Sequence, residues 1–274
     1  MVFLSAHIYK LVYYYIEYKG VTMKTTERVP EGGAIRDSSS FSCEEYGKRM
    51  YDALADEYGR FARRADSILR LPRGSRVLEI GPGPGWAGIE LLKLRPDITL
   101  TAIDASPDMI RAARKNAIDA GLRAGISYEE GVAEDLSRFA TGSFDAVVSR
   151  DSLHHWIDAA KALRELERVL TETGGVYIAD ERRDLGFAEW LIVRLQRQKI
   201  GTEMSEGWIN SIRASWTPAE IREVFPAGGP DPRAAGGGAR AGGFWRVKNP
   251  APPGGGASRP NPERPRAGGI ERMP

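Results

Sequence analysis

Cysteine is nearly absent from this chain of 274 residues, because Cys43 is the only one. A disulfide framework and a cysteine-rich metal site are therefore excluded, and we expect no bound metal. Long apolar runs are absent too: none approaches the roughly 20 residues that a membrane-spanning helix needs, so no transmembrane segment is predicted. The formal net charge is only +2, which gives no reason to expect nucleic acid as a partner.

Both ends of the chain differ from its middle. Of the 48 residues in 227–274, 21 are Gly or Pro, eight are Lys or Arg, and three are Asp or Glu. Such a stretch buries too little apolar surface to offset its ordering entropy, so we expect a disordered tail with at most one short strand at 244–247. Residues 1–41 are expected to be a leader that is disordered or precedes the true start of translation. They lack the pattern of a secretory signal, and we expect a cytoplasmic protein.

Residues 42–226 alternate between short apolar segments and amphipathic ones. The expected strands are 76–80, 98–103, 126–130, 145–149 and, after a Gly-Gly turn at 174–175, 176–179. The expected helices are 42–71, the segment from the glycine turn to 94, 106–121, 158–170, 185–200 and one from 217 onward. This alternation predicts a doubly wound, Rossmann-like α/β fold with a mostly parallel sheet and helices on both faces. No pattern of a sixth strand follows Phe225, and the last two helices are expected to pack over the substrate mouth or the sheet edge.

A glycine-rich turn follows the first strand, with the sequence Glu79-Ile80-Gly81-Pro82-Gly83-Pro84-Gly85. Glycines let the backbone approach a ligand closely, and the helix that follows has free N–H groups at its start. Trp86 stands where the third glycine of a dinucleotide fingerprint belongs, which argues against NAD or FAD.

Asp104 ends the second strand, nineteen residues after Gly85. A carboxylate at this position points at a ribose held over the first strand and accepts hydrogen bonds from its hydroxyls. The alternative is that Asp104 only complements the dipole of the following helix. Together with the glycine turn, the ribose role is preferred.

Five segments in this order resemble the motifs of the class I S-adenosylmethionine (SAM) dependent methyltransferases, near the type 11 small-molecule group. The resemblance covers about residues 46–184. The segments are 77–85 (VLEIGPGPG), 102–109 (AIDASPDM), 130–136 (EGVAEDL), 144–156 (FDAVVS followed by LHHW) and 163–175 (LRELERVL followed by GG).

The resemblance implies SAM as the cofactor and a small molecule as methyl acceptor, with the choice among oxygen, nitrogen and carbon left open. The cofactor residues it implies are Glu79, Gly81, Pro82, Gly83 and Gly85 for the methionine portion, Asp104 for the ribose, Ala105, Met109, Val132, Ala133 and Glu134 for the adenine, and Ser149 and Arg150 beside the methyl group. Many relatives carry Asp where this chain has Val132. The contact to the adenine amine is therefore expected from the backbone or from Glu134.

His154 and His155 are expected where the acceptor enters, and they are two of only three histidines in the chain. A histidine near its ordinary pKa can remove a proton from a hydroxyl acceptor, so both are candidate catalytic residues. The alternative is that they only shape the pocket, because methyl transfer from a sulfonium depends mainly on positioning.

Other side chains near the predicted site have two interpretations each. Apolar Phe187, Trp190 and Ile192 suggest an apolar acceptor, although a helix that merely packs would look the same. The tyrosines on the first helix are either a lid over the cofactor or part of the core, and core is preferred: Tyr46, Tyr51 and Tyr58.

Four competing functions remain to be weighed. A nicotinamide-dependent oxidoreductase is disfavoured by Trp86. A metal-assisted O-methyltransferase would need Asp151, Asp180 and Glu181 to converge. A nucleic-acid base methyltransferase is disfavoured because residues 149–152 read Ser-Arg-Asp-Ser, without the expected Pro-Pro-aromatic motif. A non-catalytic relative that binds or has lost SAM also stands.

Overall fold

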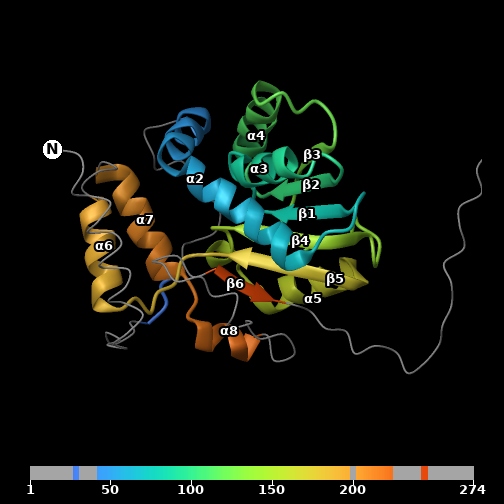
Figure 1. Cartoon of the computed structure of the whole chain (residues 1–274). Coiled ribbons are helices and arrows are strands. Elements are labelled where there is room, and N and C mark those ends of the chain that lie inside the picture. Colours follow the sequence, from blue (N-terminus) through green and yellow to red (C-terminus); the bar gives the residue numbers. More distant parts are fainter. Residues whose placement is uncertain (1–26, 31–41, 198–201, 225–241, 246–274) are drawn as a thin grey trace, which may run out of the picture.

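Six strands form one sheet in the computed structural model, which describes residues 27–30, 42–197, 202–224 and 242–245 (Figure 1). The strands are β1 (Arg76–Ile80), β2 (Thr99–Asp104), β3 (Ile126–Glu130), β4 (Phe144–Arg150), β5 (Leu170–Ala179) and β6 (Gly242–Trp245). They lie in the order β3-β2-β1-β4-β5-β6. The first five are parallel, and β6 pairs antiparallel with β5. The predicted α/β fold is therefore confirmed, and its strand order reverses between β1 and β4, where such sheets bind ligands.

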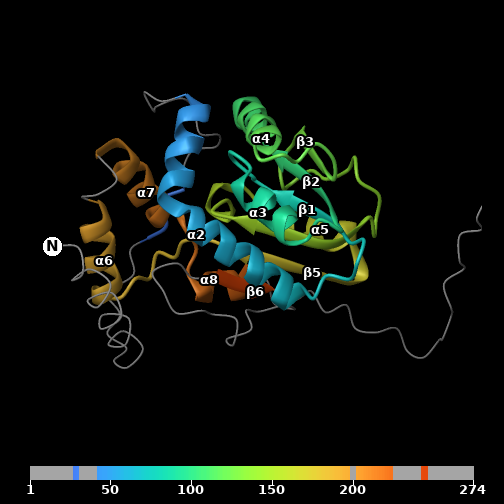
Figure 2. The ribbon, with the colours of Figure 1, turned by 45° about the horizontal axis from the view of Figure 1, so that its top comes forward.

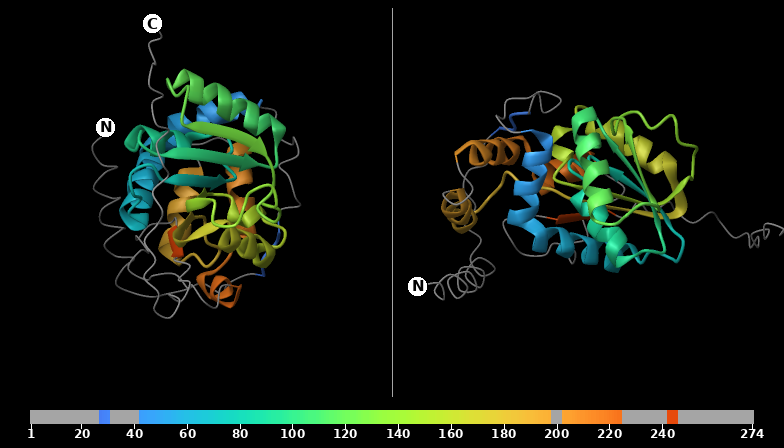
Figure 3. Two further views of the ribbon diagram at one scale, coloured as in Figure 1. Left: turned by 90° about the vertical axis from the view of Figure 1, so that its right-hand side faces the viewer. Right: turned by 90° about the horizontal axis from the view of Figure 1, so that it is seen from above.

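Helices cover both faces of the sheet (Figure 3), and alternate side chains of each strand pack on opposite faces. Val77, Leu100 and Val148 point to the face covered by α2 (Cys43–Leu69), α3 (Trp86–Leu94) and α4 (Pro107–Asp119). Leu78 and Val147 point to the opposite face, which is covered by α5 (Ala159–Val169) and flanked by α8 (Pro218–Val224). Burial of both faces explains why the strands read as nearly continuous apolar runs.

Short polar side chains begin the helices where the sequence predicts them to. The hydroxyls of Ser42 and Ser106 and the carboxylate of Asp158 each accept a hydrogen bond from a backbone N–H in the first turn of α2, α4 and α5. At α8 both bonds of a capping box form. Thr217 N donates to Glu220 Oε2 over 2.8 Å, and Glu220 N donates to Thr217 Oγ1 over 3.2 Å.

The helices α6 (Phe187–Arg197) and α7 (Thr202–Ala214) stand beyond the carboxyl ends of the parallel strands (Figures 1 and 2). The first was expected and the second was not, since no separate helix was predicted between 200 and 217. Within the described residues, no helix is both long and apolar enough to cross a lipid bilayer.

The predicted turn at Gly174–Gly175 is wrong, because β5 runs through both glycines. Phe144 pairs with Leu170, but Ala146 pairs with Gly175, so the longer strand bulges between these points. A Cβ on Gly174 would lie 2.8 Å from Leu170 Cδ2. The glycine therefore serves a close packing contact inside a bulge.

Two short segments near the chain ends lie within the described residues. Residues 27–30 fall within the predicted leader, yet Val29 N donates to Arg213 O (3.2 Å) and Arg28 Nε donates to Ala214 O (2.6 Å). The disordered tail was expected to hold a strand at 244–247, and the strand observed there is β6. The other residues of both segments lie outside the described part of the chain.

We predict opposite effects for alanine at two helical glycines. A Cβ on Gly88 in α3 would collide with the Glu79 carboxylate and lie 2.5 Å from Leu100 Cδ2, so Gly88→Ala should lower the free energy of unfolding by about 1–3 kcal/mol. The matched control is Gly207→Ala in α7, where a Cβ meets no atom within 4 Å. Helix propensity should raise stability there by up to about 1 kcal/mol. Chemical denaturation measures both; equal effects would contradict the packing described for Gly88.

Candidate functional site

The loops after β1, β2, β4 and β5 meet at the carboxyl edge of the sheet. They hold, in turn, the glycine turn, Asp104 with the start of α4, the two histidines in a short 3-10 turn (Leu153–His155), and Asp180. The topology therefore brings the main sequence-predicted groups to one edge. It also brings Asp180 there, a residue considered in the sequence only as a metal ligand.

The glycine turn uses the conformational freedom of all three glycines, because Gly81, Gly83 and Gly85 have φ angles of +64°, +53° and +88°. A Cβ on Gly85 would lie 2.7 Å from Tyr128 Oη, whereas a Cβ on Gly83 would meet no atom within 4 Å. Gly81 N donates to Ile103 O over 2.8 Å, which ties the turn to β2. The backbone at Gly83, next to Pro82, is thus the part of the turn open to a ligand.

The helix α2 covers this turn from one side. Trp86 donates its indole N–H to Gly47 O over 2.8 Å and stacks against Tyr51 with ring centres 4.3 Å apart. A Cβ on Gly47 would lie 2.8 Å from Pro84 Cβ, so only glycine permits this approach of helix and turn. Tyr58 is buried in the core and Tyr51 packs against it, which confirms the core interpretation for these two tyrosines.

Asp104 holds the glycine turn and the start of α4 together. Its Oδ2 accepts from Gly83 N (3.0 Å) and its Oδ1 accepts from Ser106 N (2.8 Å). Burial raises the pKa of the Asp104 carboxyl above its ordinary value, while the amides of Ser106 and Gly83 and the charge of His155 oppose the rise. Ala105 beside it is exposed and Met109 is buried in α4. The carboxylate stands at the sheet edge where a ribose contact was expected.

Glu79 lies behind the edge rather than on it. Its side chain is buried against the first turn of α3, and its Oε2 has no hydrogen-bond partner. Burial, and to a smaller degree the charge of Asp104, raise the pKa of Glu79 to about 8, although a hydrogen bond from the Gly88 amide opposes this. At neutral pH the group is mostly an uncharged acid.

The residues expected at the adenine follow β3. Val132 is 43% exposed and Ala133 is buried. Glu134 was expected to contact adenine, but its Oε1 already accepts from the backbone amides of Ile157 (2.7 Å) and Asp158 (3.2 Å). It thereby fastens the loop that begins α5, and the adenine contact stays a prediction.

At the end of β4, Ser149 and Arg150 point to opposite faces. Ser149 is buried and donates its hydroxyl to Ile80 O over 2.9 Å, which joins β4 to β1. The Arg150 side chain is 7% exposed, and its guanidinium carbon lies 4.2 Å from the centre of the Tyr58 ring. Ser149 thus has a clear structural role, and Arg150 is a buried cation at the site.

The two histidines differ in their surroundings. His154 is buried, and its Nδ1 lies 2.6 Å from Asp180 Oδ1, while its backbone amide donates to Asp180 Oδ2 over 2.9 Å. His155 is half-buried, with its ring centre 4.0 Å from that of His154. Arg28 also reaches this turn, donating to His154 O over 3.1 Å. A signal for this pair is present in the sequence, because Asp180 and the histidines follow adjacent strands.

No group of three potential metal ligands comes together among the described residues. Asp180 is committed to His154, and Glu181 Oε1 accepts from the Trp208 indole over 2.9 Å. Asp151 forms an ion pair with Arg150. The carboxylates considered for a metal-assisted reaction therefore do not converge in this part of the chain.

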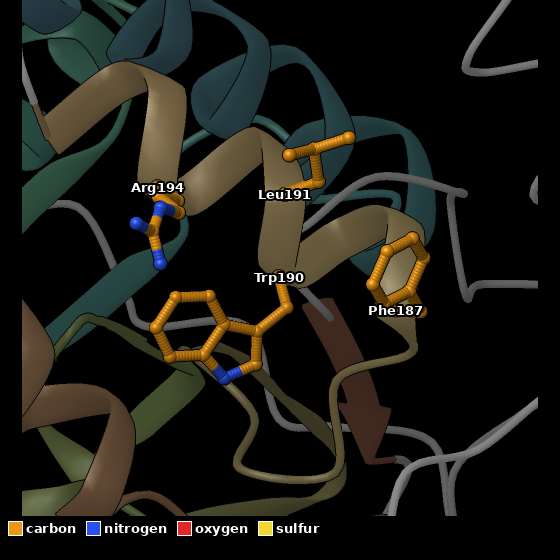
Figure 4. Close-up of a pocket in the computed structure, with 4 residues that line it drawn as sticks. All are labelled: Phe187, Trp190, Leu191 and Arg194. Carbon is orange, nitrogen blue, oxygen red and sulfur yellow. The ribbon is translucent and has the colours of Figure 1, made fainter.

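A pocket of about 280 Å³ lies on α6 (Figure 4). Phe187, Trp190, Leu191 and Arg194 line it, and Figure 4 shows all four projecting from the one helix. Phe187 is 64% exposed, so this is an open surface feature rather than an enclosed acceptor site. The expected role of Phe187 and Trp190 toward an apolar acceptor stays a prediction, and the side chain of Ile192 is outside the described residues.

The chain is similar in sequence to known methyltransferases. A family model described as a methyltransferase domain matches residues 78–178. The ubiquinone biosynthesis O-methyltransferase of Caulobacter sp. (strain K31) is 32% identical over 176 residues, which are 62% of this chain and 64% of that protein. Its counterpart from Xanthomonas axonopodis pv. citri (strain 306) is 30% identical over 112 residues, 41% of this chain and 45% of that protein. The aligned part thus spans less than half of the Xanthomonas relative.

A solved structure shares the fold. The SAM-dependent methyltransferase from Aquifex aeolicus superposes with a TM-score of 0.55 at 16% sequence identity, covering 74% of this chain and 97% of that one. At this level of identity the likeness concerns the fold, and it agrees with the Rossmann-like sheet described above.

We predict that Glu79 makes the stability of the fold fall as pH rises. Its pKa is about 8 in the folded chain and about 4.3 in an unfolded chain, so between these values unfolding releases a proton. The free energy of unfolding should then fall by about 1 kcal/mol per pH unit from pH 5 to 8 through this group. Glu79→Gln, which resembles the uncharged acid, should remove that slope in denaturation series at several pH values. An unchanged slope would show that Glu79 ionises in the folded protein.

Proposed function

Because the chain carries a class I SAM-dependent methyltransferase domain, we propose that it transfers the methyl group of SAM to a small-molecule acceptor. The observation that carries this proposal is the pairing of an open glycine turn with the Asp104 carboxylate at the point where the strand order reverses. That point is where ligands bind in open α/β sheets.

The residues at the edge fit an adenosyl ligand with an amino-acid end. The backbone at Gly83 is open and has a φ of +53°, so a ligand can approach it without meeting a side chain. Each Asp104 oxygen accepts one backbone amide and has a second lone pair for a ribose hydroxyl. Ala105 and the exposed Val132 offer apolar surface for a base.

When bound, SAM supplies a methyl group already activated on a sulfonium, so the chain has to position the acceptor and keep water out. The helices α6 and α7 stand beyond the carboxyl ends of the strands (Figure 2), where a cap over an acceptor is needed. Trp208 of α7 reaches the edge, since its indole donates to Glu181. These helices support a covered acceptor site.

An oxygen acceptor is the first to consider. The carboxylate of Asp180 can only accept, so His154 donates through Nδ1, and in the neutral imidazole the lone pair then lies on Nε2. An imidazole oriented in this way can take the proton of a hydroxyl as the oxygen attacks. The relatives named as O-methyltransferases of ubiquinone biosynthesis support an oxygen acceptor.

The nicotinamide alternative is weaker. Trp86 fills the position of the third fingerprint glycine, and its hydrogen bond and stacking fix it between α3 and α2. A non-catalytic relative that binds SAM differs from an enzyme only in its lack of turnover. The two tests below separate these cases.

We predict that calorimetric titration detects binding of SAM and S-adenosylhomocysteine (SAH) and no binding of NAD. Asp104→Ala should weaken SAM binding by about 1–3 kcal/mol, because a charge-assisted hydrogen-bond partner is lost. Asp108→Ala is the matched control, since this exposed carboxylate lies in the first turn of α4 and pairs with Arg111. Binding of NAD alone would refute the proposal, and full SAM affinity in the Asp104 variant would refute the ribose contact.

We predict that His154 and Asp180 act together on a hydroxyl acceptor. With 3,4-dihydroxybenzoate as a test hydroxyl acceptor, SAH release should rise with pH as the base loses its proton, and His154→Gln should lower kcat by about 10²- to 10⁴-fold and remove that rise. Asp180→Asn should lower kcat less, because one acceptor atom remains. His155→Gln should keep the pH dependence. If only the His155 variant lost it, the proton would belong to His155 instead.

A further inference from the structure

Arg150 is a buried cation whose hydrogen bonds are incomplete. Its side chain is 7% exposed, and its Nη2 is buried without a hydrogen-bond partner. The nearest acidic atom is Asp151 Oδ2, 3.3 Å away but outside hydrogen-bond geometry. Leaving a buried guanidinium donor unsatisfied is costly. Such a group is retained most readily where a ligand completes its bonds.

The position of Arg150 places it beside the glycine turn. Ile80 pairs with Ser149 across β1 and β4, so the next residues, Gly81 and Arg150, lie level with one another. Arg150 shares a sheet face with Val148, which packs toward α2 and α3. The glycine turn crosses to α3 on this same face. The guanidinium therefore lies on the side of the sheet to which a ligand over the turn extends.

The surroundings hold the guanidinium in a fixed place. It lies over the Tyr58 ring, with its carbon 4.2 Å from the ring centre, a contact that is favourable for a desolvated cation. Asp151 has a left-handed φ of +51°, and its amide donates to Ala179 O over 2.8 Å. A residue other than glycine in this conformation is strained. The strained backbone of Asp151 at the end of β4 therefore lies directly beside the buried Arg150 side chain.

The charge pattern favours a ligand that carries both signs. Arg150 offers planar donors that match a carboxylate, and the adjacent Asp151 keeps a negative charge at the site. The carboxylate of a simple organic acid would be attracted by Arg150 and repelled by Asp151. An α-amino acid group, with a carboxylate and an ammonium, meets a complementary charge at each end.

We propose that Arg150 binds the carboxylate of the amino-acid end of SAM. The proposal rests on the function proposed above. From the sequence, Arg150 is expected beside the methyl group of SAM, whereas the contact proposed here is with the carboxylate at the other end of the methionine portion. It also distinguishes Arg150 from Ser149, whose hydroxyl is committed to the strand.

The test compares two thioethers by calorimetry. SAH has the amino-acid end, and 5′-methylthioadenosine has the same adenosyl thioether without it. Arg150→Gln should weaken SAH binding by about 10- to 100-fold and leave the affinity for methylthioadenosine within twofold, which also shows that the variant is folded. Arg64→Gln is the control, because Arg64 lies on the exposed side of α2 and its charge, like that of Arg150, acts on the Tyr177 hydroxyl. It should change neither affinity.

A second measurement uses the unaltered protein and does not depend on the variant folding. Decarboxylated SAH, which keeps the amine but lacks the carboxylate, should bind about 10- to 100-fold more weakly than SAH. Equal binding of the two, unchanged SAH affinity in Arg150→Gln, or an equal loss of SAH and methylthioadenosine binding would each overturn the proposal. If the unaltered protein binds none of the three thioethers, the proposed function itself fails.

Discussion

The carboxylate of Asp104 is the contact on which the site depends. Its two oxygens accept the amides of Gly83 and Ser106, so one side chain fixes the turn after β1 against the helix start after β2. Three glycines at positive φ leave that turn with little intrinsic preference for one shape. A fixed acceptor beside it selects a single conformation. Asp104 therefore has two roles: it determines the conformation of the glycine turn, and it presents a negative charge at the edge of the sheet where a ligand binds.

Behind this edge, several polar groups are buried to hold the strand ends. Ser149 joins β4 to β1, and Ser152 accepts the Trp156 indole N–H over 3.1 Å. Asp180 orients His154 from the next strand. Each bond satisfies a buried donor or acceptor that would otherwise destabilise the fold. Glu79, Tyr128 and Arg150 are among the exceptions in this region, since each retains a buried polar atom without a hydrogen bond. Buried polar atoms that lack a hydrogen bond are typical of sites that bind a ligand.

The sequence predicted what local patterns determine. The strands were found because both faces are buried, and the caps at Ser106 and Asp158 because their side chains act within one turn. The features that were missed depend on distant contacts. A short strand was expected near β6, but its antiparallel pairing with β5 was not, and Arg28 is held by acceptors at Ala214 and His154. Glu134 is a further example, because its carboxylate accepts the backbone amide of Ile157. The sequence motif predicts where Glu134 lies but not which groups it bonds to.

Arg28 has a consequence for synthesis of the chain on the ribosome. Its acceptor at Ala214 lies 186 residues later in the sequence, so the contact cannot form until most of the chain has been translated. Until then, Arg28 cannot bridge the start of the chain to the carbonyl of His154 and to the end of α7. The parallel strands β1 to β5 are all complete before that point and can pair as they emerge. Nascent chains should therefore assemble the five parallel strands first, and the histidine turn should be braced only late in translation.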